Sequence, residues 1–403
     1  ESEEMYLSVL TVYQRLTIAN PQVYEPDLAR AQNNLGNLYR DTQRYKESEE
    51  MYLSAVEIYQ RLSVANPQVY EPDLARTRNN LGCLYDNTQR YKESEEMYLS
   101  VLTVYQRLTI ANPQVYELDL ARTQNNLGNL YRDTRRYEDS EKMYLSAVEI
   151  YRRLAAANPQ VYEPDLAETQ NDLGILYSDT RRYEESEEMY LSAMEIRRRL
   201  AVANPQVYEP GLARTQYNLG CLYSDTRRYE ESEKMYLSAM EIRRRLAVAN
   251  PQVYEPDLAD TQYNLGCLYY NIQRYEESGE MYLSALKVYQ RLTVADPQVY
   301  EPYLVRACNN LSFLFLAQGN FEEAERYARE GAKYDSTHHT IYTNLAASLL
   351  FQGRYAEAEE IYLRYKEELK EDFLSDFEDF YQRGIIPPER EDDVERIKKL
   401  LSK

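Results

Sequence analysis

Residues 26–62, with the sequence PDLARAQNNLGNLYRDTQRYKESEEMYLSAVEIYQRL, decide the fold of this chain. Apolar, small and aromatic side chains recur there every three or four residues, which is the period of a helix with one buried face. One such face comprises Leu28, Gln32, Leu35, Gly36 and Tyr39, and a second comprises Ser48, Tyr52, Ala55, Tyr59 and Leu62. The pattern therefore predicts two amphipathic helices, over residues 26–41 and 45–64.

The prolines on either side of a helix pair predict where the helices begin and end. We expect Asn66-Pro67 to end the second helix, because proline cannot continue a helix in its interior. Pro72 and Asp73 suit the first turn of the next helix. A missing N–H is tolerated there, and the helix dipole stabilises an acidic side chain. This interpretation gives a unit of helix, short turn, longer helix and linker.

The same unit recurs through most of the chain. The string NPQVYE, with Asp in place of Asn in the last copy, returns every 46 residues. Its tyrosines are Tyr24, Tyr70, Tyr116, Tyr162, Tyr208, Tyr254 and Tyr300. Near the C-terminus the spacing falls to 34 residues, between Leu311 and Leu345. A fixed period of this size predicts an all-α solenoid of stacked helix pairs.

Four segments follow from these periods. Residues 1–20 are expected to form the second helix of a truncated repeat, and residues 21–300 hold six repeats of 46 residues. Residues 301–366 hold two repeats at the 34-residue spacing, and residues 367–403 form an acidic helical cap for the open end of the stack. Since the sequence begins within a helix and without an initiator Met, we expect the natural chain to extend upstream.

The motif Gln32-x-x-Leu35-Gly36-x-x-Tyr39, followed by Ser48, Tyr52 and Ala55 at four- and three-residue steps, resembles the tetratricopeptide repeat (TPR). Gln replaces the usual Trp, and Ser replaces an Ala. The repeat length is most similar to the elongated repeats of kinesin light chains and of bacterial TPR arrays. The resemblance implies a right-handed α-solenoid, or superhelix, whose first helices line a concave groove that binds proteins. Small residues at positions 36 and 48 suit a close approach of the two helices.

Side chains on the opposite face of each first helix are the candidate groove residues. In the first three repeats they are mostly arginine and asparagine: Arg30, Arg76, Arg122, Asn33, Asn37, Asn79, Asn125 and Asn129. In the later repeats apolar and aromatic residues occupy these positions, among them Ile175, Tyr217, Tyr263, Tyr270 and Phe313. The groove positions vary among copies while the packing positions hardly do. We therefore expect a groove fitted to a protein or peptide with acidic and hydrophobic parts, although drift of a helix surface would also produce some variation.

An asparagine directly precedes the Leu-Gly pair in most repeats. These residues are Asn34, Asn80, Asn126, Asn218 and Asn264, with Asn310 before Leu-Ser and Asp172 departing from the pattern. In kinesin light chains the matching asparagine bonds the backbone of an extended cargo peptide, so the resemblance implies the same role here. An amide suits that role because it offers a donor and an acceptor. The alternative is that these amides bond a neighbouring helix or water.

Composition narrows the function further. The chain has 47 Lys and Arg against 67 Asp and Glu, a net charge of −20, which argues against nucleic-acid and membrane-surface partners. Four cysteines without C-x-x-C spacing suit a reducing compartment such as the cytoplasm, and Cys83, Cys221 and Cys267 are expected to be semi-buried walls of the groove. His338 and His339 have no ligand or base partner at helical spacing. We expect no metal, no cofactor and no enzymatic activity.

Runs of arginine have a structural explanation as well as a functional one. Residues 197–199 and 243–245 are expected in the last turns of second helices, where the helix dipole and a Glu four residues earlier favour cations. The alternative is a basic edge that recognises an acidic partner.

Three functions remain open. The sequence favours a non-enzymatic scaffold that holds an extended peptide of a partner in the groove. A second hypothesis is a ligand-sensing or regulatory array of a larger signalling or defence protein, with a caspase-like or NTPase domain upstream, which rests on family analogy. A third is a structural, self-associating rod.

Overall fold

The computed structural model describes residues 2–334 and 340–402, which are helical almost throughout and contain no strand. The long helices are α1 (Ser2–Ala19), α2 (Pro21–Asp41), α3 (Tyr45–Ala65), α4 (Pro67–Asn87), α5 (Tyr91–Ala111), α6 (Pro113–Asp133), α7 (Tyr137–Ala157), α8 (Pro159–Asp179), α9 (Tyr183–Ala203), α10 (Pro205–Asp225), α11 (Tyr229–Ala249), α12 (Pro251–Asn271), α13 (Tyr275–Ala295) and α14 (Pro297–Ala317). The C-terminal elements are α15 (Phe321–Gly331), α16 (Thr340–Phe351), α17 (Tyr355–Arg364), α18 (Lys366–Gln382), the 3-10 turn η1 (Pro388–Arg390) and α19 (Glu391–Ser402).

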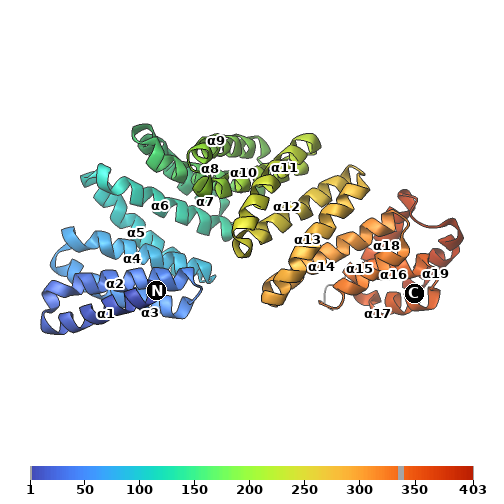
Figure 1. Cartoon of the computed structure of the whole chain (residues 1–403), viewed down its shortest axis with the longest axis horizontal. Helices are drawn as coiled ribbons and strands as arrows, with labels where there is room; N and C mark the ends of the chain where they lie inside the picture. The colour runs from blue at the N-terminus through green and yellow to red at the C-terminus, as the bar shows by residue number, and fades with distance from the viewer. Residues whose placement is uncertain (1, 335–339, 403) are drawn as a thin grey trace. The chain divides into compact units, whose positions relative to one another are not determined.

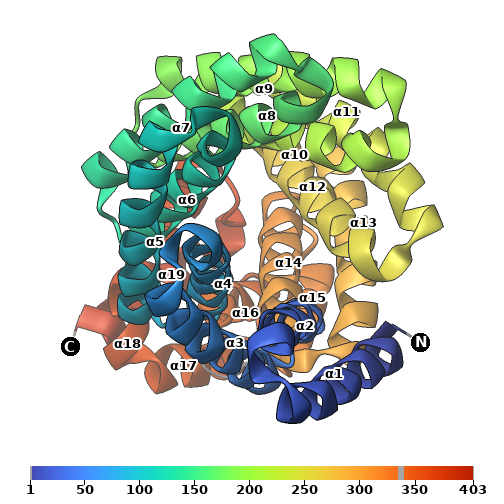
Figure 2. The same cartoon turned by 90° about the vertical axis from the view of Figure 1, so that its left-hand side faces the viewer.

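The chain divides into two compact units, Glu1–Pro205 and Gln206–Lys403. In the first unit, each helix from α1 to α9 packs against the next one along the chain (Figure 1). The first helices of successive pairs, α2, α4, α6 and α8, also contact one another in that order, and Figure 2 shows this unit from its N-terminal side. In the second unit, α11 to α17 pack in the same sequential way, and α18 and α19 cover α16 and α17. The predicted α-solenoid of helix pairs is confirmed.

The first helix of each elongated repeat begins earlier than the prolines predict. α4 starts at Pro67, which takes the first-turn position, and Pro72 lies inside the helix. Only Asn66 connects α3 to α4, so the predicted linker does not exist. In the third repeat Leu118 replaces this second proline, and α6 has the same length. An interior proline removes one backbone hydrogen bond near the helix start, which these long, packed helices tolerate.

A close contact between a glycine and a tyrosine sets the distance between the two helices of a pair. A Cβ placed on Gly36 would lie 2.7 Å from Cε1 of the buried Tyr52, so the ring packs where any other residue would clash. The Ser48 hydroxyl donates to the Gly36 carbonyl oxygen at 2.8 Å, across the same interface. Five further pairs repeat this glycine–tyrosine contact, at Gly82, Gly128, Gly174, Gly220 and Gly266.

The seventh repeat reverses this arrangement. Ser312 stands at the glycine position and donates its hydroxyl to the Ala324 carbonyl oxygen at 2.7 Å, so donor and acceptor have changed helices. Ala328 stands at the position of the buried tyrosine. A larger residue on the first helix is thus matched by a smaller one on the second. The helices can approach because the summed volume of the facing side chains stays small.

A second recurring contact links each pair to the pair before it. Arg90, directly after the turn between α4 and α5, lies over the Tyr85 ring at 4.1 Å from its centroid. The same guanidinium donates to Glu49 of the preceding pair at 2.8 Å and to Glu93 at 3.0 Å. Equivalent arginines stack on a tyrosine in the other elongated repeats, namely Arg44, Arg136, Arg182, Arg228 and Arg274.

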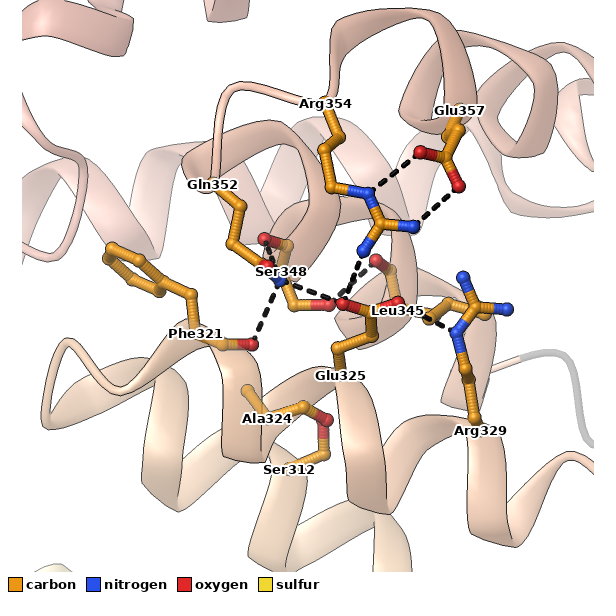
Figure 3. A network of polar contacts seen from close by, with 10 residues as sticks. All are labelled: Ser312, Phe321, Ala324, Glu325, Arg329, Leu345, Ser348, Gln352, Arg354 and Glu357. Atoms are coloured by element: carbon orange, nitrogen blue, oxygen red, sulfur yellow. Dashed lines mark hydrogen bonds and ion pairs between the residues drawn. The ribbon is translucent and has the colours of Figure 1, made fainter.

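Glu325 joins the last repeats through a network of charged hydrogen bonds (Figure 3). Its carboxylate accepts from Arg329 on the same helix, and from Gln352 and Arg354 in the turn between α16 and α17. Burial raises the pKa of Glu325, but these three hydrogen bonds outweigh burial and lower it overall. The cap helix α18 contacts α16 and buries Phe373, Phe377 and Phe380.

The glycine contact yields a direct test. Gly128→Ala should destabilise the chain by about 1–3 kcal/mol, because its new methyl group would lie 2.6 Å from two atoms of the Tyr144 ring. Gly279→Ala is the matched control. The added Cβ would meet only Leu314 Cδ2, at 3.4 Å, so better helix propensity should leave stability equal or raised. Urea unfolding of both variants measures the difference, and equal stabilities would contradict the role given to Gly128.

Candidate functional site

The first unit contains a cavity of about 400 Å³ that is lined by the concave faces of α2, α4 and α6. Eight of the predicted groove residues line it: Arg30, Asn33, Asn34, Asn37, Arg76, Asn79, Asn80 and Arg122. Asn125, Asn126 and Asn129 lie on α6 outside the lining. Side chains separated by 46 residues or more in the sequence therefore meet around one space.

Each arginine of the cavity is paired with an aspartate. Arg76 lies 3.2 Å from Asp73 on its own helix, and Arg30 pairs in the same way with Asp27. Arg122 reaches across to Asp165 of the next repeat at 3.3 Å. Asp119 also lines the cavity; burial raises its pKa, against the opposing charges of Arg76 and Arg122. The cavity therefore offers both signs of charge, whereas the sequence pattern predicts a polar surface rich in arginine and asparagine.

Sequence reasoning missed the tyrosines of the cavity. Tyr59 and Tyr105 come from the second helices α3 and α5 and line it with Asp73, Asp119 and two threonines. The Tyr59 hydroxyl donates to the Pro26 carbonyl oxygen at 3.3 Å. The sequence pattern places Tyr59 on the buried face of its helix, which favours a packing role. Contact with the groove becomes evident only in the structure, where both tyrosines reach the cavity lining.

The asparagines before Leu-Gly bond the preceding repeat. The side-chain amide of Asn80 donates to Asn33 Oδ1 at 3.0 Å, and that of Asn126 donates to Asn79 Oδ1 at 3.3 Å. In the second unit Asn264 donates to the Tyr217 hydroxyl at 2.8 Å, and Asn310 donates to the Tyr263 hydroxyl at 2.7 Å. Asn218 lies half-buried on α10, while Asn34 is exposed. Most of this ladder thus contributes to contacts between repeats.

Those bonds do not use the whole amide. In the part of the chain that the structure describes, the side-chain oxygens of Asn80 and Asn126 accept no hydrogen bond, and Asn34 makes none. The buried Oδ1 of Asn125 likewise finds no partner there. Each amide has two N–H donors and one acceptor oxygen. Hydrogen-bonding capacity therefore remains on the concave face.

The groove position of Asn37 accepts a hydrogen bond from the buried tyrosine of the same helix pair. Asn37 accepts from the Tyr52 hydroxyl at 2.6 Å, and Asn129 accepts from Tyr144 at the same distance. At this position in other repeats the acceptor is a thiol: Cys83, Cys221 or Cys267, at 3.2–3.3 Å from the tyrosine hydroxyl. The three thiols are free and half-buried, as predicted. Burial raises their pKa, so they stay protonated and unreactive.

The aromatic residues predicted to face a ligand pack within the second unit. Tyr263 is only 7 % exposed and lies against Tyr282, which corrects the prediction that it faces a partner. Tyr217 packs against Tyr236, with the guanidinium of Arg243 over its ring at 4.6 Å. The phenol rings are held by hydrogen bonds and ring contacts of their own chain.

The cap covers the remaining aromatic positions. Arg383, directly after α18, donates to the Tyr270 hydroxyl at 2.7 Å. Phe380 of α18 packs against Phe313 with ring centroids 5.9 Å apart. The hydrophobic surface that the sequence assigns to a ligand is therefore contacted by the chain's own C-terminal segment.

Two arginines predicted at helix ends are buried instead. Arg197 reaches Glu168 on the first helix of its repeat at 2.5 Å. Arg243 donates to Thr261 Oγ1 at 2.6 Å and to the Asp257 carbonyl oxygen at 2.9 Å. Both stand where other repeats have the tyrosine equivalent to Tyr59. α9 and α11 continue well beyond them, so neither arginine lies in a last turn.

Metal-binding clusters and membrane-spanning helices are both absent from the described part of the chain. Residues 2–334 and 340–402 contain no cluster of His, Cys, Asp and Glu that could hold a metal ion. Over the same ranges no helix has the length and hydropathy needed to cross a bilayer. His338 and His339 lie outside the described residues.

Comparison with known families identifies the repeat. Tetratricopeptide repeat models match residues 27–107, 119–199 and 165–245, and further models of that description match 258–297 and 315–374. This chain belongs to the tetratricopeptide repeat family. TPR units are in general interaction modules without catalytic activity, so the array indicates protein–protein interaction. Among curated proteins, none matches this TPR chain.

Solved structures share the fold of this TPR chain at low identity. BtubC (BKLC) from P. vanneervenii is 23% identical, with a TM-score of 0.50 over 62% of this chain and 91% of that one. A STAND ATPase with a TPR sensor, PH0952 from Pyrococcus horikoshii, is 16% identical, with a TM-score of 0.61 over 93% of this chain and 54% of that one. The apo form of RapI is 14% identical, with a TM-score of 0.59 over 93% and 97%. The chain thus spans about half the length of the STAND protein.

Asp86, on α4 near the cavity residues, has an unfavourable environment. Burial and the nearby Asp133 carboxylate raise the pKa of Asp86 to about 6, although Arg132 opposes the shift. Its buried Oδ1 has no hydrogen-bond partner in the described chain. Because the folded state holds this proton more tightly than the unfolded state, stability should fall as pH rises from about 4 to 6 and stay lower above.

Asp86→Asn should therefore stabilise the chain at pH 7.5 by about 1 kcal/mol, and by less at pH 5, since an amide does not ionise. Urea unfolding at the two pH values measures this difference. Asp41→Asn is the control. Asp41 is the last residue of α2, is exposed and accepts a hydrogen bond from Arg40. A loss of stability in Asp86→Asn at pH 7.5 would contradict the assignment.

Proposed function

We propose that this TPR chain is a non-enzymatic scaffold that binds an extended, polar peptide segment of a protein partner along α2, α4 and α6. The observation that carries the proposal is the cavity of about 400 Å³, whose walls combine amides with paired charges. Asn34 and the oxygens of Asn80 and Asn126 offer hydrogen bonds that the described chain does not use. A peptide backbone supplies the complementary N–H and C=O groups.

The spacing of the asparagines suits an extended chain. Successive packed helices lie about 8–10 Å apart. An extended peptide rises about 3.3 Å per residue, so every third residue would reach the next asparagine. Asn34, Asn80 and Asn126 occur at 46-residue steps on α2, α4 and α6, which contact one another in that order. Contacts to the backbone would hold the segment whatever its side chains are.

The charges of the cavity restrict the side chains of the partner. Arg30 and Arg76 are each shared with an aspartate, so a ligand carboxylate competes with Asp27 or Asp73 for its arginine. Such exposed pairs are weak, because solvent screens them. A segment with both acidic and basic residues can exchange partners with these pairs, whereas a purely acidic segment would meet Asp73 and Asp119. The aromatic residues of the second unit need no hydrophobic partner, since they pack internally.

A peptide selection tests this function. A random peptide library displayed on phage is selected on the immobilised full chain, and enriched peptides are synthesised and measured by calorimetry. Asn34→Ala combined with Arg76→Ala should weaken binding by about tenfold or more, because the double variant removes hydrogen bonds without opening a core. The matched control is Asn87→Ala with Arg152→Ala, which changes exposed residues of the same types outside the cavity.

Two outcomes would contradict the scaffold function. Either no peptide is enriched over an uncoated surface, or the cavity variant and the control bind the selected peptides equally. Circular dichroism and urea unfolding confirm that both variants are folded before binding is compared.

A second candidate is a sensor array in a larger signalling or defence protein. It is supported by the likeness to a STAND ATPase with a TPR sensor, over 93% of this chain and 54% of that one. At 16% identity this likeness is evidence for a shared fold only. It therefore supports the sensor function less strongly than the cavity supports the scaffold function. A phosphate loop or a Cys/His dyad encoded upstream of Glu1 would support it, whereas a signal peptide or further repeats would contradict it.

We propose that this TPR chain is located in the cytoplasm. Cys83, Cys221, Cys267 and Cys308 are all free thiols, which suits a reducing compartment. Fractionation of the source cells, followed by detection of the chain with an antibody, tests this placement.

A further inference from the structure

The corner between one helix pair and the next exposes two aliphatic side chains. At the first three corners the end of the second helix presents Ile18, Val64 or Ile110, each 84–86 % exposed. On the other side of the Asn-Pro corner, Val23, Val69 and Val115 are about half exposed. These six residues are called the corner row. Because α2, α4 and α6 contact one another in order, the corners follow one edge of the first unit.

The corner row keeps its aliphatic character although it is exposed. The position of Ile18 is occupied in later copies by Val64, Ile110, Ala156, Val202, Val248 and Val294. The residue has changed among Ile, Val and Ala and has never become polar. The adjacent position, which starts with Thr17 and Ser63, holds a hydroxyl residue in four copies and alanine in three. β-Branched residues are poor helix formers, so helix stability does not explain this preference at an exposed site.

The corner row is also free of the acidic charge that dominates the chain. Segments of thirteen residues around the corners, such as 14–26, 60–72 and 106–118, carry a net charge of zero. The opposite ends of the helix pairs are acidic, with net charges between −3 and −1 over segments such as 41–50, 133–142 and 179–188. Ion pairs lie beside the corners, as in Arg61–Glu25 at 2.7 Å and Arg107–Glu71 at 2.6 Å, and in each pair the arginine is exposed while the glutamate is half-buried.

We propose that the corner row is the interface for a second copy of this chain, related to the first by a two-fold axis. A second copy presents the same spacing of side chains, so the aliphatic residues of one edge fit between those of the other along its whole length. In such a dimer Arg61 and Glu25 of one edge face the opposite charges of the other. Pairing along this edge keeps the acidic turn ends apart, although each chain carries a net charge of −20.

The interface depends on several corners at once. A stable dimer buries about 800 Å² on each partner, which two aliphatic residues at one corner do not supply. Three consecutive corners together contribute six aliphatic side chains and the ion pairs beside them. Single substitutions should therefore have small effects, whereas simultaneous changes at three corners should have a large one.

Sedimentation equilibrium of the full chain at several concentrations tests the dimer. The native chain should change from monomer to dimer as its concentration rises, and Ile18→Gln, Val64→Gln and Ile110→Gln together should weaken dimerisation about tenfold or more. The matched control combines Leu53→Gln, Leu99→Gln and Leu145→Gln, which removes three aliphatic side chains that are 42–47 % exposed from α3, α5 and α7 away from the corners. The control should dimerise like the native chain.

A native chain that stays monomeric at all concentrations would overturn the proposal, as would equal dimerisation of the corner variant and the control. Association that weakens steeply with added salt would also overturn it, because an aliphatic interface between acidic chains should be insensitive to salt or strengthened by it. The cavity residues are not changed in either variant, so the peptide-binding function is tested separately.

Discussion

The contact between a glycine of the first helix and a tyrosine of the second is the constraint on which the rest of this array depends. In six repeats the glycine leaves room for the ring, and the serine hydroxyl donates to the glycine carbonyl oxygen within the same buried interface. The seventh repeat shows that volume and hydrogen bonding matter rather than residue identity, since Ser312 and Ala324 exchange the roles of donor and acceptor. A helix pair held at fixed distance can then stack on identical neighbours at a fixed interval.

The concave face follows from this contact. The packed tyrosine needs a partner for its hydroxyl, which lies at the groove. There Asn37, Cys83 or Asn129 accepts the hydrogen bond that the hydroxyl donates. Several polar groove residues are therefore required by packing before any ligand binds. The remaining groups are Asn34, the free amide oxygens, and arginines held by exposed ion pairs. Recognition is proposed to rest on this smaller set, which is why it favours a polar, extended segment.

Much of the fold could be predicted from the sequence, because the 46-residue period and the Leu-Gly frame are local and repeated. The predicted start of each first helix was wrong, because Pro72 stands in a sequence that suits a first helical turn. Only Leu118, which replaces this proline in one copy, indicates that the helix begins earlier. Helical spacing places eight of the residues that line the cavity on one face of their helices. The ion pair of Arg122 could not be predicted, because Asp165 meets it only across a repeat boundary, whereas Arg30 and Arg76 pair with aspartates three residues away on their own helices. The prediction that aromatic side chains face a ligand could not anticipate the cap, because no periodic signal indicates that Arg383 contacts Tyr270, 113 residues earlier in the chain.

The central claim is that glycine and tyrosine act as one unit in fixing the helix pair, and a double-mutant cycle at Gly174 and Tyr190 tests it most directly. Unfolding free energies are measured in urea for Gly174→Ala, for Tyr190→Leu and for the double variant. If the added methyl group and the ring compete for one space, the double variant should lose about 1–2 kcal/mol less than the sum of the single losses. Losses that add within about 0.5 kcal/mol would show that the two residues stabilise the pair independently, and would contradict the account.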